Sequence, residues 1–164
     1  FGRPVAYPQG TEQIYGLPKA LQRLPKVRML YAKRTGKPLQ ILRTDTAAKI
    51  FRQIIGSQMT VKEHAIMLFI DNANHVVGYF KIAEGGLAAT VMDLRIILSA
   101  ALNVLATGII IGHNHPSGQI NPSLADKTFT KEMQEAGRMM DIKLLDHIIV
   151  TPKEYYSFAE NEML

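Results

Sequence analysis

The chain has 164 residues, of which 47% are hydrophobic, and it contains no cysteine. This length and composition are typical of one globular domain, and the lack of cysteine excludes disulfides, thiol catalysis and cysteine-ligated metals. The formal net charge is +5, but residues 1–52 carry eleven Lys or Arg against two acidic residues, whereas residues 53–164 carry eight against twelve. The basic character therefore belongs to the first third of the chain.

Hydropathy and the opening residues guide the expected location. The apolar runs are short and interrupted by polar residues, so the sequence predicts no membrane span. The opening segment, FGRPVAYPQG, lacks the charged and then apolar layout of a signal peptide. We therefore expect a cytoplasmic protein without a membrane partner.

Residues 1–40 are predicted to form a basic N-terminal arm, and residues 41–164 a folded domain. Prolines and glycines punctuate the arm, which leaves room for a short helix near 17–24 and a hairpin that pairs KVRMLYA with PLQIL. The arm could follow a nucleic-acid backbone or pack on the acidic remainder of the chain, and its apolar spacing slightly favours packing. Its candidate phosphate contacts, called the arm trio below, are Lys33, Arg34 and Lys37.

The folded domain is predicted to open with a helix, TDTAAKIFRQII, over residues 44–55. Its apolar residues recur at helical spacing, so one face of the helix is directed to a core. Thr44 or Asp45 can cap the start of the helix, and Gly56 is typical of its end.

Two strands and a second helix are predicted next. EHAIMLFID (63–71) is nearly all apolar, as expected of a strand covered on both faces, and HVVGYFKIAE (75–84) follows a tight turn as its antiparallel neighbour. TVMDLRIILSAALNVLA (90–106) is predicted as a long helix, with Thr90 as the N-cap and Asp93 at the third helical position.

The last third of the chain repeats this alternation of strands and helices. TGIIIG (107–112) is predicted as a short buried strand, residues 123–140 as an amphipathic helix and IKLLDHIIV (142–150) as a further strand. A final helix is expected from TPKEYYSFAE, with Pro152 at its first position. Strands mixed with packed helices indicate an α/β or α+β domain of three layers.

Two histidines and an aspartate follow the apolar strand GIIIG. Because residues i and i+2 of an extended chain point to the same side, His113 and His115 can face one point in space. Asp126 lies in the first turn of the next helix, where it can face back toward the strand end. Two imidazoles and a carboxylate with an open fourth position are the ligands of catalytic zinc. The simpler alternative is an exposed loop followed by a capping box made by Ser123 and Asp126.

The stretch HNHPSGQINPSLAD resembles the metal motif of the JAB/MPN (JAMM) metalloprotease superfamily, H-x-H-P followed by S-x-x-D. The downstream LLDHIIV makes the bacterial RadC-like branch, which is named for DNA repair, the most similar one. The resemblance runs from about residue 41 to 160 and agrees with the predicted order of elements. It implies a three-layer JAB/MPN (cytidine-deaminase-like) fold with a mixed β-sheet flanked by helices.

The resemblance also implies roles for individual residues. Zinc would be held by His113, His115 and Asp126. Ser123 would lie near the attacking water and the developing oxyanion. A glutamate before the first core strand would act as the general base; the order of elements favours Glu63, and Glu84 is the competing candidate.

Some residues fit this pattern less directly. His147, on the strand LLDHIIV, is predicted to be a hydrogen-bonded core histidine or a group that contacts a metal ligand. Asn114 stands between the two motif histidines, where eukaryotic deubiquitinating members usually carry Ser or Thr. RadC-like chains usually place a helix–hairpin–helix DNA-binding module before the JAB domain, and the basic arm occupies that place here.

Three functions follow from these observations. The first is a zinc-dependent peptidase or isopeptidase acting on a peptide or protein. The second is a DNA-associated module, related to DNA repair or mobile elements, that uses the domain as a platform and the basic arm for phosphate contact. The third is an inactive scaffold, against which the complete set of three metal ligands argues. The sequence fixes neither the substrate nor the oligomeric state.

Overall fold

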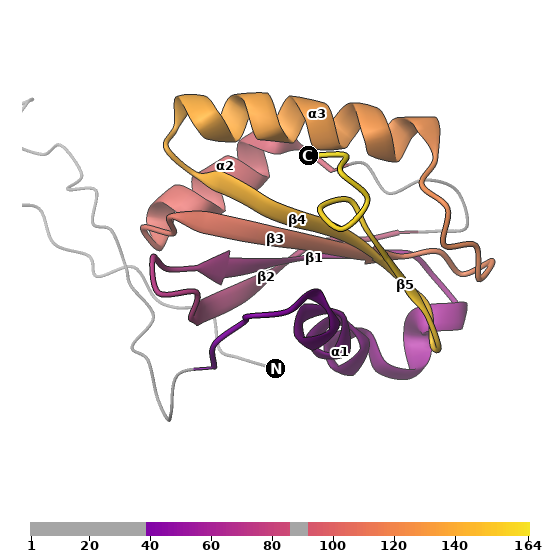
Figure 1. The fold of residues 1–164 in the computed structure, drawn as a ribbon. Helices are drawn as coiled ribbons and strands as arrows, with labels where there is room; N and C mark the ends of the chain where they lie inside the picture. The colour runs from indigo at the N-terminus through magenta and orange to yellow at the C-terminus, as the bar shows by residue number, and fades with distance from the viewer. Residues whose placement is uncertain (1–38, 86–91) are drawn as a thin grey trace, which may run out of the picture. The chain divides into compact units, whose positions relative to one another are not determined.

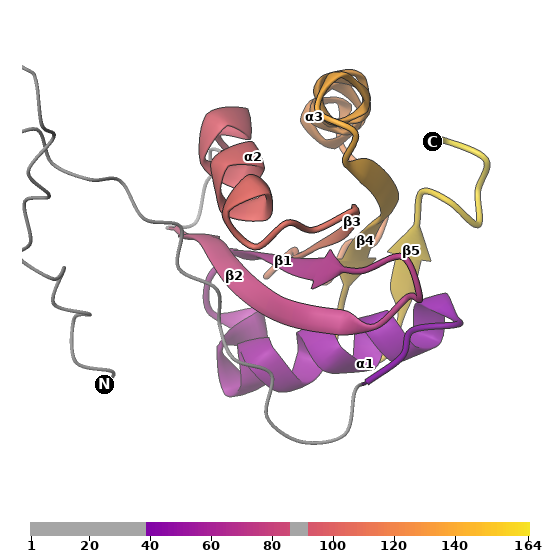
Figure 2. The same ribbon diagram turned by 90° about the vertical axis from the view of Figure 1, so that its left-hand side faces the viewer.

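The computed structural model describes residues 39–85 and 92–164 of the chain. One five-stranded sheet has the strand order β2-β1-β3-β4-β5. Helix α1 covers one face of this sheet, and helices α2 and α3 cover the other (Figures 1 and 2). The expected three-layer α/β architecture with a mixed sheet is confirmed. The helices are α1 (Thr44–Ile55), the short 3-10 helix η2 (Gly56–Thr60), α2 (Leu94–Asn103) and α3 (Leu124–Met139).

Strand β3 occupies the centre of the sheet. It pairs antiparallel with β1 and parallel with β4, while the pairs β1–β2 and β4–β5 are antiparallel. Helix α3 makes the crossover that a parallel pair requires. Every residue of β1 and β3 is buried, as their apolar sequences predict. The strands are β1 (His64–Ile70), β2 (Val76–Glu84), β3 (Gly108–Asn114), β4 (Lys143–Val150) and β5 (Tyr155–Ser157).

The alternation of side chains along β3 divides the core into two clusters. Ile109 and Ile111 pack in the cluster beneath α2 and α3, whereas Ile110 packs in the cluster beneath α1. The same period of two continues to the end of the strand, so His113 belongs to the α3 side and Asn114 to the opposite side. This alternation decides which residues can meet at the candidate site.

Helix α1 approaches β3 very closely beside the first motif histidine. A Cβ atom built on Gly112 would lie 2.4 Å from the ring of Phe51, which is fully buried. Glycine is therefore required here for packing, because any side chain would overlap the aromatic ring. The contact fixes the height of α1 above the strand that carries His113.

The predicted ends of the first two helices are partly wrong. Gly56, with φ of 62°, does end α1, but the N-cap is Arg43, which makes no side-chain cap bond, and not Thr44 or Asp45. Helix α2 starts at Leu94 with Asp93 as its N-cap, because the Asp93 carboxylate accepts the Arg95 amide hydrogen. The expected cap at Thr90 lies outside the described residues.

The predicted final helix is also wrong. Residues 151–154 form a turn closed by Thr151 and Glu154, and residues 155–157 return as β5 against the end of β4. Two consecutive tyrosines favour a strand over a helix, which explains the difference. In the described ranges, no helix has the length and apolar character needed to cross a membrane.

Most of the predicted N-terminal arm lies outside the described residues. This applies to its short helix, the first strand of its hairpin and the arm trio. Of the predicted second hairpin strand, Gln40 forms an isolated bridge with His75 at the edge of the sheet.

Candidate metal centre

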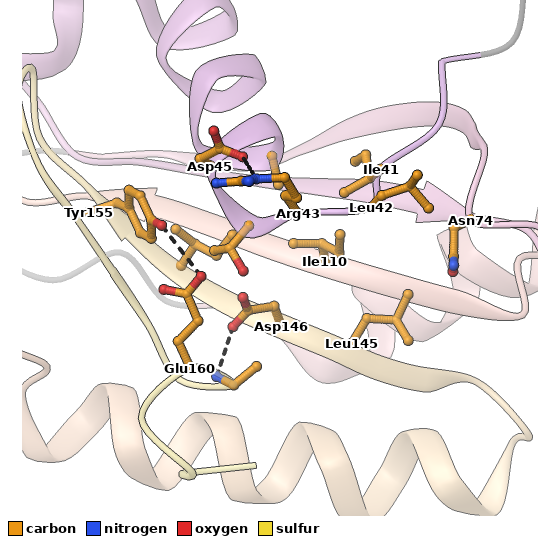
Figure 3. A pocket seen from close by; sticks show the side chains of 14 residues that line it. Ile41, Leu42, Arg43, Asp45, Asn74, Ile110, Leu145, Asp146, Tyr155 and Glu160 are labelled. Atoms are coloured by element: carbon orange, nitrogen blue, oxygen red, sulfur yellow. Dashed lines mark hydrogen bonds and ion pairs between the residues drawn. The ribbon is translucent and has the colours of Figure 1, made fainter.

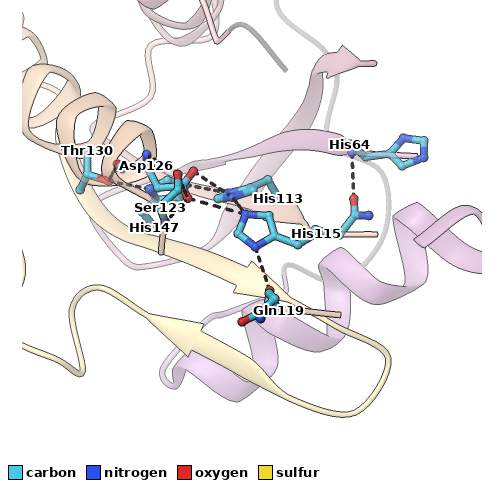
Figure 4. A network of polar contacts seen from close by, with 9 residues as sticks. His64, His113, His115, Gln119, Ser123, Asp126, Thr130 and His147 are labelled. Atoms are coloured by element: carbon cyan, nitrogen blue, oxygen red, sulfur yellow. Dashed lines mark hydrogen bonds and ion pairs between the residues drawn. The ribbon is translucent and has the colours of Figure 1, made fainter. Parts of the chain in front are cut away.

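The three predicted metal ligands lie together at the end of β3. His113 is the penultimate residue of β3, and His115 is the first residue after the strand. Asp126 lies in the first turn of α3. Figure 4 shows their side chains pointing toward one another. The Nε2 atom of His113 lies 3.0 Å from Nε2 of His115 and 3.1 Å from Oδ1 of Asp126. One ligand atom from each residue lies within 4.8 Å of the others.

The outward hydrogen bond of His115 determines which of its nitrogens faces the centre. His115 Nδ1 lies 2.8 Å from the backbone oxygen of Gln119 and must donate to it, because a carbonyl only accepts. In a neutral ring, Nε2 of His115 then carries the lone pair. The donor set of two imidazole nitrogens and one carboxylate oxygen therefore fits a divalent cation such as zinc.

The pKa shifts of Asp126 and His115 also favour a cation at this site. Burial alone raises the pKa of Asp126, but hydrogen bonds with His113 and His115 outweigh burial and hold this pKa well below its ordinary value. The hydrogen bond to Asp126 raises the pKa of His115, against the opposing effect of burial. A carboxylate that stays ionised attracts positive charge, so protons and a metal ion would compete for the same place.

Ser123 and Asp126 form the capping box that the sequence predicts at the start of α3. The Ser123 hydroxyl donates to Asp126 Oδ2 at 2.6 Å, and the Ser123 amide donates to the same oxygen at 2.7 Å. These two bonds leave Oδ1, the atom close to His113, as the oxygen that faces the cluster. The capping box thus also orients a candidate ligand.

A cavity of about 770 Å³ opens beside the cluster. Glu63, the preferred candidate for the general base, lines it together with His115, Ser123 and Asp126. Glu84 is not among the lining residues, and its carboxylate pairs with Lys62. The structure thus brings Glu63, and not Glu84, to the space next to the candidate ligands.

Asn114 connects the strand of the metal ligands to the backbone around Glu63. Its Oδ1 accepts the amide hydrogen of His64 at 2.8 Å. Its Nδ2 donates to the backbone oxygens of Met59 at 2.7 Å and Lys62 at 2.9 Å. A Ser or Thr hydroxyl has a single donor hydrogen and cannot make both donor bonds at once. Asn114 therefore fixes the segment that carries Glu63, a role that the sequence did not indicate.

His147 contacts the candidate ligand His113 on the side away from the other two ligands. It is fully buried, with Nε2 2.9 Å from Nδ1 of His113 and Nδ1 2.6 Å from the hydroxyl of Thr130. Its ring stacks on Phe158, with centroids 4.8 Å apart and planes 15° apart. The sequence left open whether His147 is a core residue or a group that contacts a metal ligand. In the structure it is both, because it is fully buried and contacts His113. Neither Thr130 nor Phe158 was indicated by any sequence motif.

A second cavity, of about 520 Å³, lies on the α1 side of the sheet (Figure 3). Asp146 borders it and is nearly buried; its carboxylate accepts bonds from Ser157 Oγ at 2.7 Å and the Ala159 amide at 3.1 Å. Burial raises the pKa of Asp146 against these bonds. None of the three candidate metal ligands lines this cavity.

Comparison with known proteins places the chain in a family. Residues 41–163 match the family described as RadC-like JAB domain. A UPF0758 protein of Flavobacterium johnsoniae is 41% identical over 121 residues, which are 74% of this chain and 52% of that protein. The UPF0758 protein YfjY of Escherichia coli K12 is 36% identical over 103 residues, or 63% of this chain and 64% of the relative.

A third relative, from Haemophilus influenzae, is 33% identical over 144 residues, which are 88% of this chain and 65% of that UPF0758 protein. The chain spans about half the length of the Flavobacterium and Chlorobium relatives it matches. None of these names states an activity. Because the family match covers most of the chain and the expected fold is present, this protein belongs to the RadC-like JAB domain family.

Proposed function

We propose that this domain is a zinc-dependent hydrolase that cleaves amide bonds of a peptide or protein, including isopeptide bonds. The observation that carries the proposal is the convergence of His113, His115 and Asp126 beside a cavity that Glu63 lines. The JAB domain family includes hydrolases, and a metal ligand set next to an accessible carboxylate is what amide hydrolysis by a metalloenzyme requires.

The metal ligands, Glu63 and Ser123 have defined tasks in this proposal. Zinc held by the three ligands supplies Lewis acidity, which polarises a carbonyl oxygen and lowers the pKa of water. Glu63 takes a proton from the attacking water and delivers it to the leaving amine. Ser123 first orients Asp126, because its single hydroxyl hydrogen is given to that carboxylate. It assists the oxyanion only after this hydrogen turns toward the substrate.

Metal content tests the ligand assignment. Purified wild type, equilibrated with zinc and dialysed, should hold about one zinc per chain, whereas His113→Ala combined with His115→Ala should hold almost none. His75→Ala is the matched control, because His75 pairs with Asp71 at the other end of β1 and should leave the zinc content unchanged. Full zinc content in the double variant would contradict the assignment.

A pair of charge-neutral variants tests the general base. Glu63→Gln should retain zinc but lower amide hydrolysis by about 10² to 10⁴, the usual contribution of a positioned acid or base. Glu84→Gln should break the pair with Lys62 and leave both zinc content and hydrolysis unchanged. A rate of Glu63→Gln equal to that of wild type would exclude Glu63 as the base.

Nucleic-acid binding by the arm is a second candidate function. The excess of Lys and Arg in residues 1–52 supports it. This function does not compete with hydrolysis, because the arm trio and the metal ligands belong to different parts of the sequence.

A further inference from the structure

We propose that the cavity beside the candidate metal centre selects substrates with a basic side chain next to the scissile amide, and that Glu132 on α3 recognises its charge. This inference rests on the proposed function and deepens it, because it names the substrate class of the same site. The cavity has a volume of about 770 Å³, which leaves room for a side chain beside the amide group. Its lining combines an apolar surface with carboxylates.

One face of α3 forms a long wall of this cavity. Beyond the candidate ligand Asp126, the lining residues of the helix recur at the spacing of a single helical face, and they are Leu124, Ala125, Thr128, Phe129 and Glu132. Glu132 follows Asp126 by six residues, so it is displaced by about 9 Å along the helix axis. The cavity therefore extends from the candidate ligands along α3, over a distance that a long side chain of a bound peptide can cover.

The apolar part of the lining fits a hydrocarbon stem. Met92, Leu124 and Phe129 line the cavity, and Leu124 leaves 81% of its surface exposed. Long basic side chains pack their methylene stems on apolar surface and keep the charged head in a polar place. Aromatic ring faces also attract cations. The stem of a lysine or arginine can thus lie on Leu124 and Phe129 while its head reaches further along α3, to Glu132.

One carboxylate of the cavity has no other task. Glu63, Asp126 and Glu132 are lining residues. Asp126 contacts both candidate histidine ligands and Ser123, and Glu63 is the candidate base. Glu132 is exposed and makes no hydrogen bond or ion pair within the described part of the chain. Asp126 and Glu63 together balance the charge of a divalent cation, so the charge of Glu132 remains available to a substrate.

The basic residues of the same helix do not offset this charge inside the cavity. Lys127 and Lys131 are exposed residues of α3, and neither of them lines the cavity. Among the described lining residues there is no lysine or arginine. An acidic substrate side chain would therefore be repelled by Glu132, and an uncharged one would gain only contact with the apolar wall. A basic side chain gains both the apolar contact and the charge interaction.

Two synthetic peptides that differ by one charge test the inference. One is acetyl-Gly-Gly-Lys-Gly-Gly-amide, and the other carries norleucine in place of lysine, which keeps the four-carbon stem and lacks the amino group. The first readout is binding to the intact chain, with and without zinc, followed by the proton–nitrogen NMR signals of Thr128 and Phe129. The second is cleavage of each peptide by the zinc-loaded protein, measured by mass spectrometry. Glu132→Gln removes the charge, and Glu135→Gln is the matched control, because Glu135 is an exposed residue of α3 that does not line the cavity.

Wild type and Glu135→Gln should bind the lysine peptide roughly three- to tenfold more tightly than the norleucine peptide, as expected for one partly exposed charge pair beside an aromatic ring. In Glu132→Gln this ratio should fall close to one, and in wild type it should decrease as salt is added. Equal affinities in wild type, no binding of either peptide up to millimolar concentration, or a preference that persists in Glu132→Gln would refute the inference. If the lysine peptide is preferred in binding but neither peptide is cleaved, the proposed hydrolysis of such peptides fails and recognition by Glu132 stands.

Discussion

Replacing Asn114 with alanine should destabilise the domain by about 3 kcal/mol. The substitution removes three hydrogen bonds at a fully buried position. A typical bond contributes about 0.5–1.5 kcal/mol net, and a buried donor left without a partner costs about 1–3 kcal/mol. The amide of His64 becomes such a donor, because Oδ1 of Asn114 is the acceptor that the substitution removes.

Urea denaturation of metal-free protein measures this loss, because bound metal would add its own stabilisation to the free energy of unfolding. Asn161→Ala is the matched control: its side chain makes one bond, to the Ser157 oxygen at 2.7 Å, on an exposed residue. We expect a loss of about 1 kcal/mol or less for the control. A loss below about 1 kcal/mol for Asn114→Ala, or a loss equal to that of the control, would refute the conclusion that Asn114 fixes the segment that carries Glu63.

Three further predictions concern other parts of the chain. Gly112→Ala should cost about 1–3 kcal/mol in urea denaturation, because the new Cβ would overlap Phe51, whereas Gly78→Ala, whose Cβ would lie 3.7 Å from the nearest atom, should cost clearly less. Burial raises the pKa of Asp146, so its contribution to stability is complete below the ordinary pKa of an aspartate and is lost as the pH rises through the folded-state pKa. The free energy of unfolding of Asp146→Asn relative to wild type should therefore increase from acidic to neutral pH, and a flat difference would contradict this. If the arm binds nucleic acid, neutralising the arm trio should flatten the salt dependence of DNA binding in filter assays and leave zinc content unchanged; if the arm packs on the domain, the same change should lower stability instead.

The sequence was sufficient for the features that depend on local spacing. His113 and His115 are two residues apart on an extended chain, and Ser123 and Asp126 are three apart at a helix start. Such spacings determine geometry without knowledge of the rest of the fold. Glu63 could be placed only through the order of elements, because it meets His115 across a cavity and not along the chain.

The remaining contacts depend on strand register, which the sequence does not determine. Ile111 pairs with His147 in the parallel β3–β4 ladder, and this register brings the imidazole behind His113. A register one residue different would point His147 to the other face of the sheet, toward α1. Thr130 and Phe158 contact His147 from a helix and a turn that pack over β4, so their roles become visible only in three dimensions.

The end of β3 joins the two halves of the candidate site through its alternating side chains. His113 and His115 face α3 and form the cation cluster, while Asn114 between them faces the opposite side and holds the backbone around Glu63. A slip of this strand by one residue would exchange the faces, placing an amide in the cluster and removing both imidazoles from it. β1 and β4, paired along its two edges, and Phe51, seated against Gly112, oppose such a slip. The packing that stabilises the centre of the sheet therefore also fixes the position of the candidate ligands relative to the candidate base.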